Sequence, residues 1–280
     1  MSHEGFRHIL SPVDFSGTSL LGLRMAGSLA ECSGARLTAV YADQFLPPPY
    51  FTHGRLEEIQ KQLSGAREQA EIHLSQVVSE VLGRKDVEAR VVTALPVEGI
   101  LQAAAESGAD LIAMGTHGRS GFNRMMLGSV TEKILRASTV PVLTVHPGAA
   151  SAGHFPRIRR VLCPVNDSEV SRKALQLAAG VAKCFGAELT VLHVKEKGPD
   201  GGIADLCSWV PADVRSQCTM REEVREGEAA QEIIQSASGA DCDLLVLGAR
   251  RRRFFDSTVI GTTSVRVVRH APCPVLTVTA

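Results

Sequence analysis

The chain has 280 residues, and its thirty basic and thirty acidic side chains give a formal net charge of zero. A neutral chain lacks the long-range field that recruits nucleic acid or an anionic membrane. No apolar run approaches the roughly 20 residues needed to span a bilayer, and the N-terminal segment has no signal-peptide layout. We therefore predict a cytoplasmic protein with neither a nucleic-acid nor a membrane partner.

Seven cysteines are spread along the chain, among them Cys163, Cys184 and Cys242 in apparent core segments. An odd number without a compact spacing favours reduced thiols over a disulfide framework. The spacing of Cys207 and Cys218 is not that of a zinc site. We predict reduced cysteines and no metal ligands.

In the first part of the chain, short β-branched runs alternate with longer helical patterns, as in βαβ units with a parallel sheet. The predicted strands are 7–13, 36–42, 87–93, 110–115 and 141–146, and the predicted helices are 17–33, 56–83, 97–107 and 129–138. This alternation predicts an α/β fold with a five-stranded parallel sheet of flavodoxin-like order 3-2-1-4-5 and helices on both faces.

The segment 148–156 is rich in small residues and has no periodicity, so we predict a linker between domains 1–147 and 157–280. The same plan then recurs. The predicted strands are 159–165, 188–194, 219–225, 243–248 and 274–279, and the predicted helices are 170–185, 228–237 and 262–270. The region 195–218 takes the place of the long second helix.

The numbering shows that the chain is a tandem repeat. Pro12 and Pro164 differ by 152 positions, whereas Gly115 and Gly248 differ by 133. The second copy has therefore lost 152 − 133 = 19 residues between these points. A repeat of this length is a whole domain rather than a solenoid unit.

A glycine pattern follows the fourth predicted strand: Gly115-x-x-Gly118, then nine residues, then Gly128-Ser129. Glycines let backbone N–H groups approach an anion without an intervening Cβ, and Ser129 opens a helix whose N-terminus favours bound phosphate. The pattern is neither a Walker loop nor GxGxxG. On its own, such a pair of glycines is also a common turn.

Asp14 ends the first predicted strand, and its carboxylate could accept hydrogen bonds from ribose hydroxyls or a purine amine. The alternative is an N-cap of the following helix. In the predicted strand order, Asp14 and Gly115 both face the crevice where the order reverses. Arg119 and Arg124 could add charge-assisted contacts to phosphates, whereas His117 is either a phosphate contact or a solvent-facing loop residue.

With these motifs, the chain resembles the universal stress protein family in its tandem form, whose domains have an adenine nucleotide alpha-hydrolase-like fold. The resemblance implies ATP in the first domain, with ADP or AMP as alternatives, with or without Mg²⁺, and no catalytic residues. The residues that it implies, together with Arg119 from the motif, are Pro12, Val13, Asp14, Ala42, Met114, Gly115, Gly118, Arg119, Gly128, Ser129 and Val130. Ala42 stands where the family usually has Val.

The second copy keeps Gly248, Gly261 and Thr262, but Asn166 replaces Asp14 and Arg251 replaces Gly118. These changes predict a degenerate or repurposed site. The run Arg250, Arg251, Arg252 and Arg253 is predicted to be a solvated loop, with an anion site as the alternative.

The favoured function is an ATP-binding stress-response protein in which the nucleotide controls conformation or the binding of an unknown protein partner. A slow ATPase or nucleotidyl-transfer enzyme and a ligand-free scaffold are the alternatives. The terminal strands 141–146 and 274–279 each have an edge with unpaired backbone N–H and C=O groups, which can pair with another strand. This predicts an intramolecular pseudo-dimer of the two halves, with a homodimer as a further option.

Overall fold

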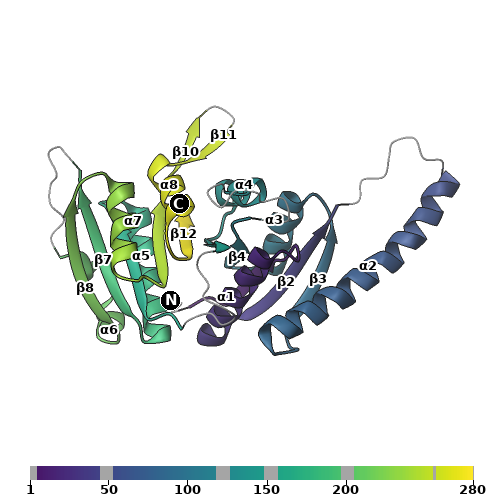
Figure 1. Cartoon of the computed structure of the whole chain (residues 1–280), viewed down its shortest axis with the longest axis horizontal. Coiled ribbons are helices and arrows are strands. Elements are labelled where there is room, and N and C mark those ends of the chain that lie inside the picture. Colours follow the sequence, from purple (N-terminus) through teal and green to yellow (C-terminus); the bar gives the residue numbers. More distant parts are fainter. Residues whose placement is uncertain are drawn as a thin grey trace.

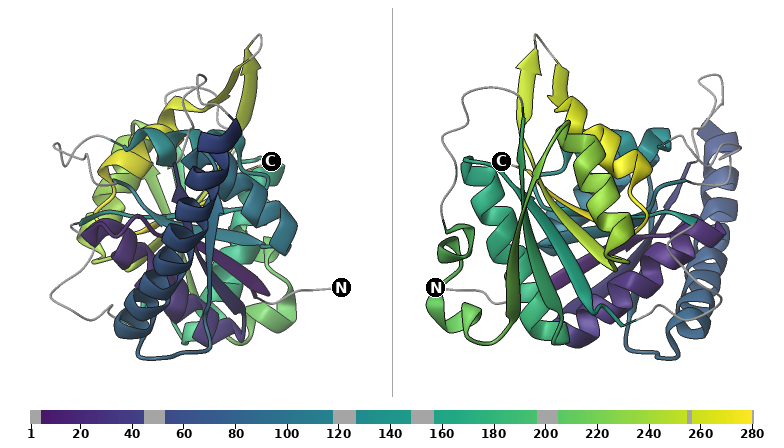
Figure 2. Two further views of the ribbon diagram at one scale, coloured as in Figure 1. Left: turned by 90° about the vertical axis from the view of Figure 1, so that its right-hand side faces the viewer. Right: turned by 60° about the vertical axis from the view of Figure 1, so that its left-hand side comes forward.

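The computed structural model describes residues 5–44, 53–117, 127–147, 157–196, 205–254 and 257–279, with the backbone alone for 53–64 and 251–260. The predicted linker 148–156 lies outside these ranges. In Figures 1 and 2, the two halves lie side by side, each with a twisted sheet and helices on both faces. No helix in the described ranges is both long enough and apolar enough to cross a membrane.

The first half has the predicted α/β organisation. Its strands are β1 (His8–Pro12), β2 (Arg36–Asp43), β3 (Glu88–Thr93), β4 (Leu111–Gly115) and β5 (Val142–Val145), and its helices are α1 (Gly17–Ser33), α2 (His53–Leu82), α3 (Pro96–Ser107) and α4 (Ser129–Ala137). The strands pair in parallel in the order β3-β2-β1-β4-β5. The carboxyl ends of β1 and β4 therefore lie next to each other.

The second half repeats this winding. Its main strands are β6 (Arg160–Val165), β7 (Glu188–Lys195), β8 (Thr219–Glu226), β9 (Leu244–Ala249) and β12 (Val275–Thr279), and its longer helices are α5 (Glu169–Phe185), α7 (Ala229–Gly239) and α8 (Thr262–His270). The order is β8-β7-β6-β9-β12. The short helices η2 (Leu206–Trp209) and α6 (Ala212–Arg215) lie where the long second helix is missing. The predicted fold class is confirmed.

The arginine run differs from its prediction as a solvated loop. Arg251–Phe254 forms strand β10, which pairs antiparallel with β11 (Ser257–Ile260) in a separate two-stranded sheet. β11 contains β-branched residues, which favour a strand. The arginines form the other strand of the hairpin because they pair with β11. The hairpin projects beyond the main sheet, and β11 contacts α4 of the first half (Figure 1).

The two sheets join through their terminal strands, since β5 and β12 pair antiparallel. Leu143 lies opposite Leu276, and these residues occupy equivalent positions of the repeat, because 276 − 143 = 133. A pairing of equivalent residues in antiparallel strands is the geometry of an approximate twofold axis. The result is one ten-stranded sheet that runs through both halves.

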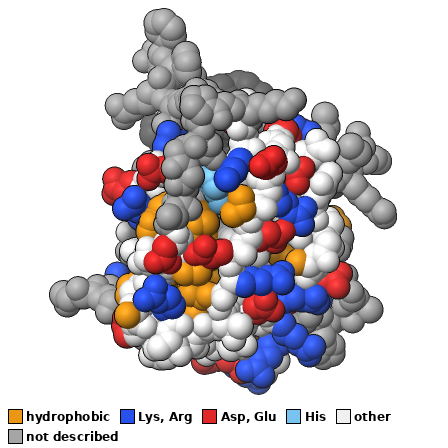
Figure 3. Space-filling model, turned by 90° about the vertical axis from the view of Figure 1, so that its left-hand side faces the viewer, with side chains coloured by type: hydrophobic (Ala, Val, Ile, Leu, Met, Phe, Trp, Pro, Cys, Tyr) orange, Lys and Arg blue, Asp and Glu red, His pale blue; other side chains and the backbone are white. Residues whose placement is uncertain are grey.

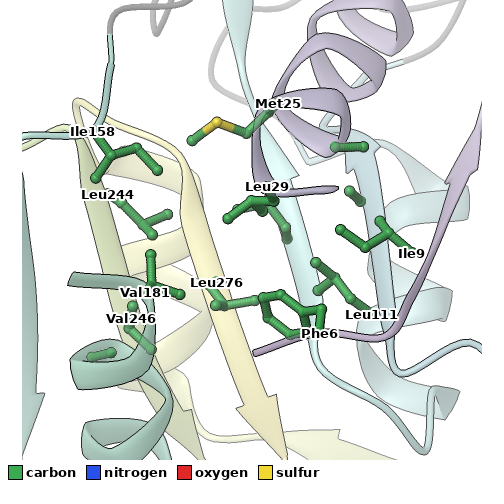
Figure 4. Close-up of a cluster of buried hydrophobic side chains, with 14 of the residues drawn as sticks. Phe6, Ile9, Met25, Leu29, Leu111, Ile158, Val181, Leu244, Val246 and Leu276 are labelled. Carbon is green, nitrogen blue, oxygen red and sulfur yellow. The ribbon is translucent and has the colours of Figure 1, made fainter. Parts of the chain in front are cut away.

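The apolar core on one face of this sheet is continuous across the joint. Helices α1, α2 and α5 cover that face, and α3, α4, α7 and α8 cover the other. Figure 4 shows Phe6 of the first half close to Leu276 of the second and Met25 close to Ile158, with Leu29 between these two pairs. Burial of these side chains contributes to holding the halves together, at about 25 cal/mol for each Å² of apolar surface removed from water.

The outer edge of the second half is β8, whose side chains are mostly charged and partly or fully exposed. Figure 3 shows acidic and basic side chains interspersed on this face of the molecule. Charged side chains discourage edge-to-edge pairing with another chain. The edges that meet inside the molecule, β5 and β12, are instead apolar and buried.

One prediction about the cysteines is wrong, because Cys32 and Cys184 form a disulfide with a Cα–Cα distance of 5.8 Å. Cys32 lies in the last turn of α1, and Cys184 lies in the last turn of α5. Their separation of 152 residues equals the repeat offset, so the approximate twofold axis brings two equivalent positions together. The other five cysteines are free thiols.

Candidate functional site

Asp14 lies in the turn that joins β1 to α1. Its Oδ1 accepts hydrogen bonds from the backbone N–H of Ser16 at 3.0 Å and from the Ser16 hydroxyl at 2.5 Å. Ser16, not Asp14, is the N-cap of α1, because its hydroxyl oxygen accepts the backbone N–H of Ser19 at 3.2 Å. The alternative prediction of Asp14 as the helix cap is therefore wrong.

The residue after Asp14 has an uncommon backbone conformation. Phe15 has φ of 64°, in the left-handed region that non-glycine residues rarely adopt. Its ring lies 5.0 Å from that of Tyr41 and 4.9 Å from that of His73, measured between centroids. Backbone strain of this kind costs roughly 1–3 kcal/mol and clusters at functional sites.

Gly115, at the end of β4, is required for the packing of α1. A Cβ at this position would lie 2.6 Å from the carbonyl oxygen of Thr18, and a Cβ on Gly22 would lie 2.8 Å from the backbone nitrogen of Gly115. Because these contacts involve backbone atoms, they cannot be relieved by a side-chain rotation. The glycine predicted to admit phosphate thus has a structural role in bringing α1 against β4.

The N-terminus of α4 lies against the end of β4. The backbone N–H of Gly128 donates to the carbonyl oxygen of Thr116 at 2.8 Å, and the Thr131 hydroxyl donates to the carbonyl oxygen of Gly115 at 3.0 Å. Gly128 is the N-cap residue, and no side chain of the described residues caps the helix there. The positive end of the α4 dipole at this point is of the sign that favours an anion.

Two histidines lie beside this helix terminus. Burial lowers the pKa of His117, whose Nδ1 is 2.9 Å from the Thr116 hydroxyl oxygen. Burial also lowers the pKa of His146, and the nearby His117 lowers it further. Without a bound anion, the lowered pKa values favour the uncharged form of both rings at neutral pH.

The remaining described candidates line the same end of the sheet. Pro12 ends β1, and the backbone N–H of the next residue, Val13, donates to the carbonyl oxygen of Val40 at 2.8 Å. Ala42 is partly buried near the end of β2. Met114 is buried in β4, and Val130 packs against the core beneath α3 and α4.

These contacts join the predicted residues into one region. The backbone N–H of Asp14 donates to the Ser19 hydroxyl at 3.2 Å, Ser19 borders Gly115, and Gly115 accepts the hydroxyl of Thr131 in α4. Gly118, Arg119 and Arg124 lie outside the described residues.

The equivalent turn of the second half uses a neutral side chain. Asn166 Oδ1 accepts the hydroxyls of Ser168 at 2.5 Å and Ser171 at 2.8 Å, and the Asn166 N–H donates to the Ser171 hydroxyl at 3.3 Å. Ser168 caps α5 as Ser16 caps α1. Here, however, the Ser168 N–H donates to the main-chain carbonyl oxygen of Asn166, and no left-handed residue equivalent to Phe15 is found in this described turn.

Gly248 has the same packing role in the second half as Gly115 has in the first. A Cβ on Gly248 would lie 2.9 Å from the carbonyl oxygen of Val170 in α5. Its retention is therefore explained by the contact with α5 and is not evidence for a nucleotide. Gly261 caps α8 without a side-chain hydrogen bond, and Arg250 is exposed beside the hairpin.

Sequence reasoning missed the serines that shape both turns. Ser16 and Ser168, like Ser19 and Ser171, differ by the repeat offset of 152. A search for every position that keeps this offset would have found them. The same search would have paired Cys32 with Cys184.

Comparison with known proteins identifies the family. The universal stress protein family model matches residues 5–146 and 157–279. These two matches cover most of the sequence, so the chain belongs to the universal stress protein family, in tandem form. The resemblance found from the sequence motifs is confirmed.

Two relatives each match somewhat less than half of the chain. Universal stress protein MJ0531 of Methanocaldococcus jannaschii is 29% identical over 141 residues, which span 43% of this chain and 81% of the relative. A universal stress protein of Thermus aquaticus is 32% identical over 134 residues, which span 43% of this chain and 98% of the relative.

A solved structure resembles the whole molecule. The crystal structure of a universal stress protein from Archaeoglobus fulgidus DSM 4304 has a TM-score of 0.74 and 24% identity, covering 97% of this chain and 98% of that one. This similarity extends the shared fold over both halves.

Proposed function

We propose that the N-terminal half binds an adenine nucleotide, ATP above ADP and AMP, between the carboxyl ends of β1 and β4. The supporting observation is the pair Asp14 and Asn166. In the equivalent turn, the neutral amide oxygen of Asn166 accepts the serine hydroxyls. Accepting these hydrogen bonds therefore does not require a charged side chain. The charge of Asp14 therefore suits a ligand, since a carboxylate forms stronger hydrogen bonds with hydroxyl and amine donors.

The phosphates and the nucleoside would contact different parts of this region. The N-terminus of α4, which no side chain in the described part of the chain caps, suits the negative phosphates, and Gly118 and Arg119 would complete that side. Asp14 repels phosphate and so suits the ribose hydroxyls or the adenine amine. Ala42 leaves more room for the base than Val would.

In this proposal the nucleotide acts as a regulator. The molecule works as an intramolecular pseudo-dimer of domains 1–147 and 157–280, and binding shifts the equilibrium between conformations that differ in affinity for a protein partner or a second copy. Such a shift requires the nucleotide to bind one conformation more tightly than the other. No turnover of ATP is needed for this role.

Calorimetric titration with ATP, ADP and AMP tests the proposal, with GTP as the control for base selectivity. We expect one adenine nucleotide per chain, with ATP bound most tightly. Two per chain would contradict the degenerate second site, and no binding would leave a ligand-free scaffold. A parallel assay of phosphate release with Mg²⁺ should remain near background, and steady turnover would instead identify an ATPase.

A further inference from the structure

The Cys32–Cys184 disulfide lies at the joint between the halves, where the C-terminal ends of α1 and α5 meet. Both cysteines are partly exposed. By contrast, Cys163, Cys242 and Cys273 are buried. The disulfide is therefore more accessible to an external reagent than these thiols are.

A cavity of about 520 Å³ opens beside this disulfide. Its wall includes Cys184, together with Phe6, Leu29 and Val181 from both halves and the cationic Lys183. Cys32 is not among the lining residues. A reagent that enters the cavity therefore reaches the bond from the side of Cys184.

Four of the five free thiols, those of Cys163, Cys207, Cys218 and Cys273, are poor reagents for exchange with this bond. Burial raises the pKa of Cys207 to about 11, and burial also raises the pKa of Cys163 and Cys218. A hydrogen bond between Cys273 and Cys242, together with burial, raises the pKa of Cys273. Because the thiolate is the attacking species, these protonated thiols exchange slowly at neutral pH, and efficient reduction requires an external thiol.

We propose that Cys32–Cys184 is a reversible thiol–disulfide site, opened by a dithiol reductant and closed by a disulfide oxidant, which controls how firmly α1 and α5 are held together. One thiolate of the reductant attacks Sγ of Cys184. The bond between the two cysteines breaks, and Cys32 leaves as a thiolate that takes up a proton.

The second thiolate of the reductant then attacks the other reductant sulfur, the one bonded to Cys184 in the mixed disulfide. Cys184 leaves and is protonated, and the reductant becomes a disulfide, so two electrons have passed to the protein. A disulfide oxidant reverses both steps.

Reduction leaves other contacts between the halves in place. β5 and β12 still pair, and the apolar cluster around Leu29 and Val181 still spans the joint (Figure 4). The expected response is a local loosening of the last turns of α1 and α5, without separation of the halves. This inference does not depend on nucleotide binding.

The first test counts thiols in the folded full-length protein by maleimide labelling and mass measurement. After oxidation with oxidised glutathione we expect five reactive thiols on denaturation, and seven after treatment of the native protein with dithiothreitol. The native reduction rate should rise in proportion to dithiothreitol concentration. Failure to form the bond, or reduction only when the protein unfolds, would overturn the proposal.

Two matched variants test which sulfur is attacked. Cys32→Ser leaves Cys184 as the single joint thiol, and Cys184→Ser leaves Cys32. With oxidised glutathione as the probe, the mixed disulfide should form at least about fivefold faster in Cys32→Ser, and equal rates would overturn the assignment to Cys184. Amide hydrogen exchange in the last turns of α1 and α5 should be faster in the reduced protein than in the oxidised one. The double variant, with Cys32→Ser and Cys184→Ser, should show the faster exchange whatever the redox state. Unchanged exchange would overturn the loosening.

Discussion

Asp14 and Asn166 occupy the same turn in the two halves, yet only one of them is charged. In both turns a side-chain oxygen accepts a serine hydroxyl, and a serine caps the following helix. The first turn adds a carboxylate and a left-handed Phe15. The shared features belong to the fold, and the differences are where a ligand of one half alone should be sought.

The glycines after the fourth strand of each half support the same distinction. Gly115 and Gly248 are both retained, and both bring a helix against the end of a strand. A motif residue can therefore be kept for packing even where the site has degenerated. Only the residues that differ between the halves, such as Asp14 and Asn166, distinguish a binding role from a structural one.

The largest expected effect concerns the disulfide, which the two halves share equally. Closing a loop of 152 residues stabilises the folded chain by about 5 kcal/mol in the chain-entropy estimate, if the halves unfold together. Cys32→Ser and Cys184→Ser should each lose this amount in denaturant unfolding under oxidising conditions, with no further loss in the double variant. Unequal losses would show that the joint is not symmetric.

A smaller effect is expected from overpacking in each half. Gly115→Ala and Gly248→Ala each place a Cβ within 3 Å of helix backbone, which should destabilise the protein by about 1–3 kcal/mol. Gly65→Ala is the matched control, because a Cβ added at this position would have no atom within 4 Å. This substitution should leave the stability unchanged or raise it. A harmless Gly248→Ala would remove the packing explanation for that residue.

The smallest effect is expected at the helix caps. Ser16→Ala and Ser168→Ala each remove an N-cap hydrogen bond, which typically costs about 1 kcal/mol. Exposed Ser75, inside α2, provides the control, and Ser75→Ala should change the free energy of unfolding little. Equal losses at Ser16 and Ser168 would support a purely structural role, whereas a much larger loss at one would show that the turns differ in more than charge.

Much of the fold was predictable because each strand is a short β-branched run and each long helix has a clear period. The β10–β11 hairpin was missed because Arg251–Phe254 has no alternation of apolar and polar residues, so its strand is set by pairing with β11. The disulfide was missed because cysteine spacing was considered along the chain alone. Its two cysteines become neighbours only through the pairing of equivalent surfaces.

The candidate site was predicted unevenly. Asp14, Ala42 and the start of α4 lie at one end of the sheet, as strand order requires. The packing role of Gly115 was not predicted, since the sequence does not show which backbone atoms lie opposite its missing Cβ. The strain at Phe15 was not predictable, because no residue type at that position signals a left-handed conformation.

The most direct test of the account is the ATP affinity of Asp14→Asn, with Asn166→Ala as its matched control. Asn166 shows that an amide oxygen can accept hydroxyls in this turn, so Asp14→Asn should fold normally while losing the charge. We predict that ATP binds Asp14→Asn about tenfold to a hundredfold more weakly, the range for a charged hydrogen bond, and binds Asn166→Ala as it binds the natural chain. Unchanged affinity in a folded Asp14→Asn variant would contradict the central claim.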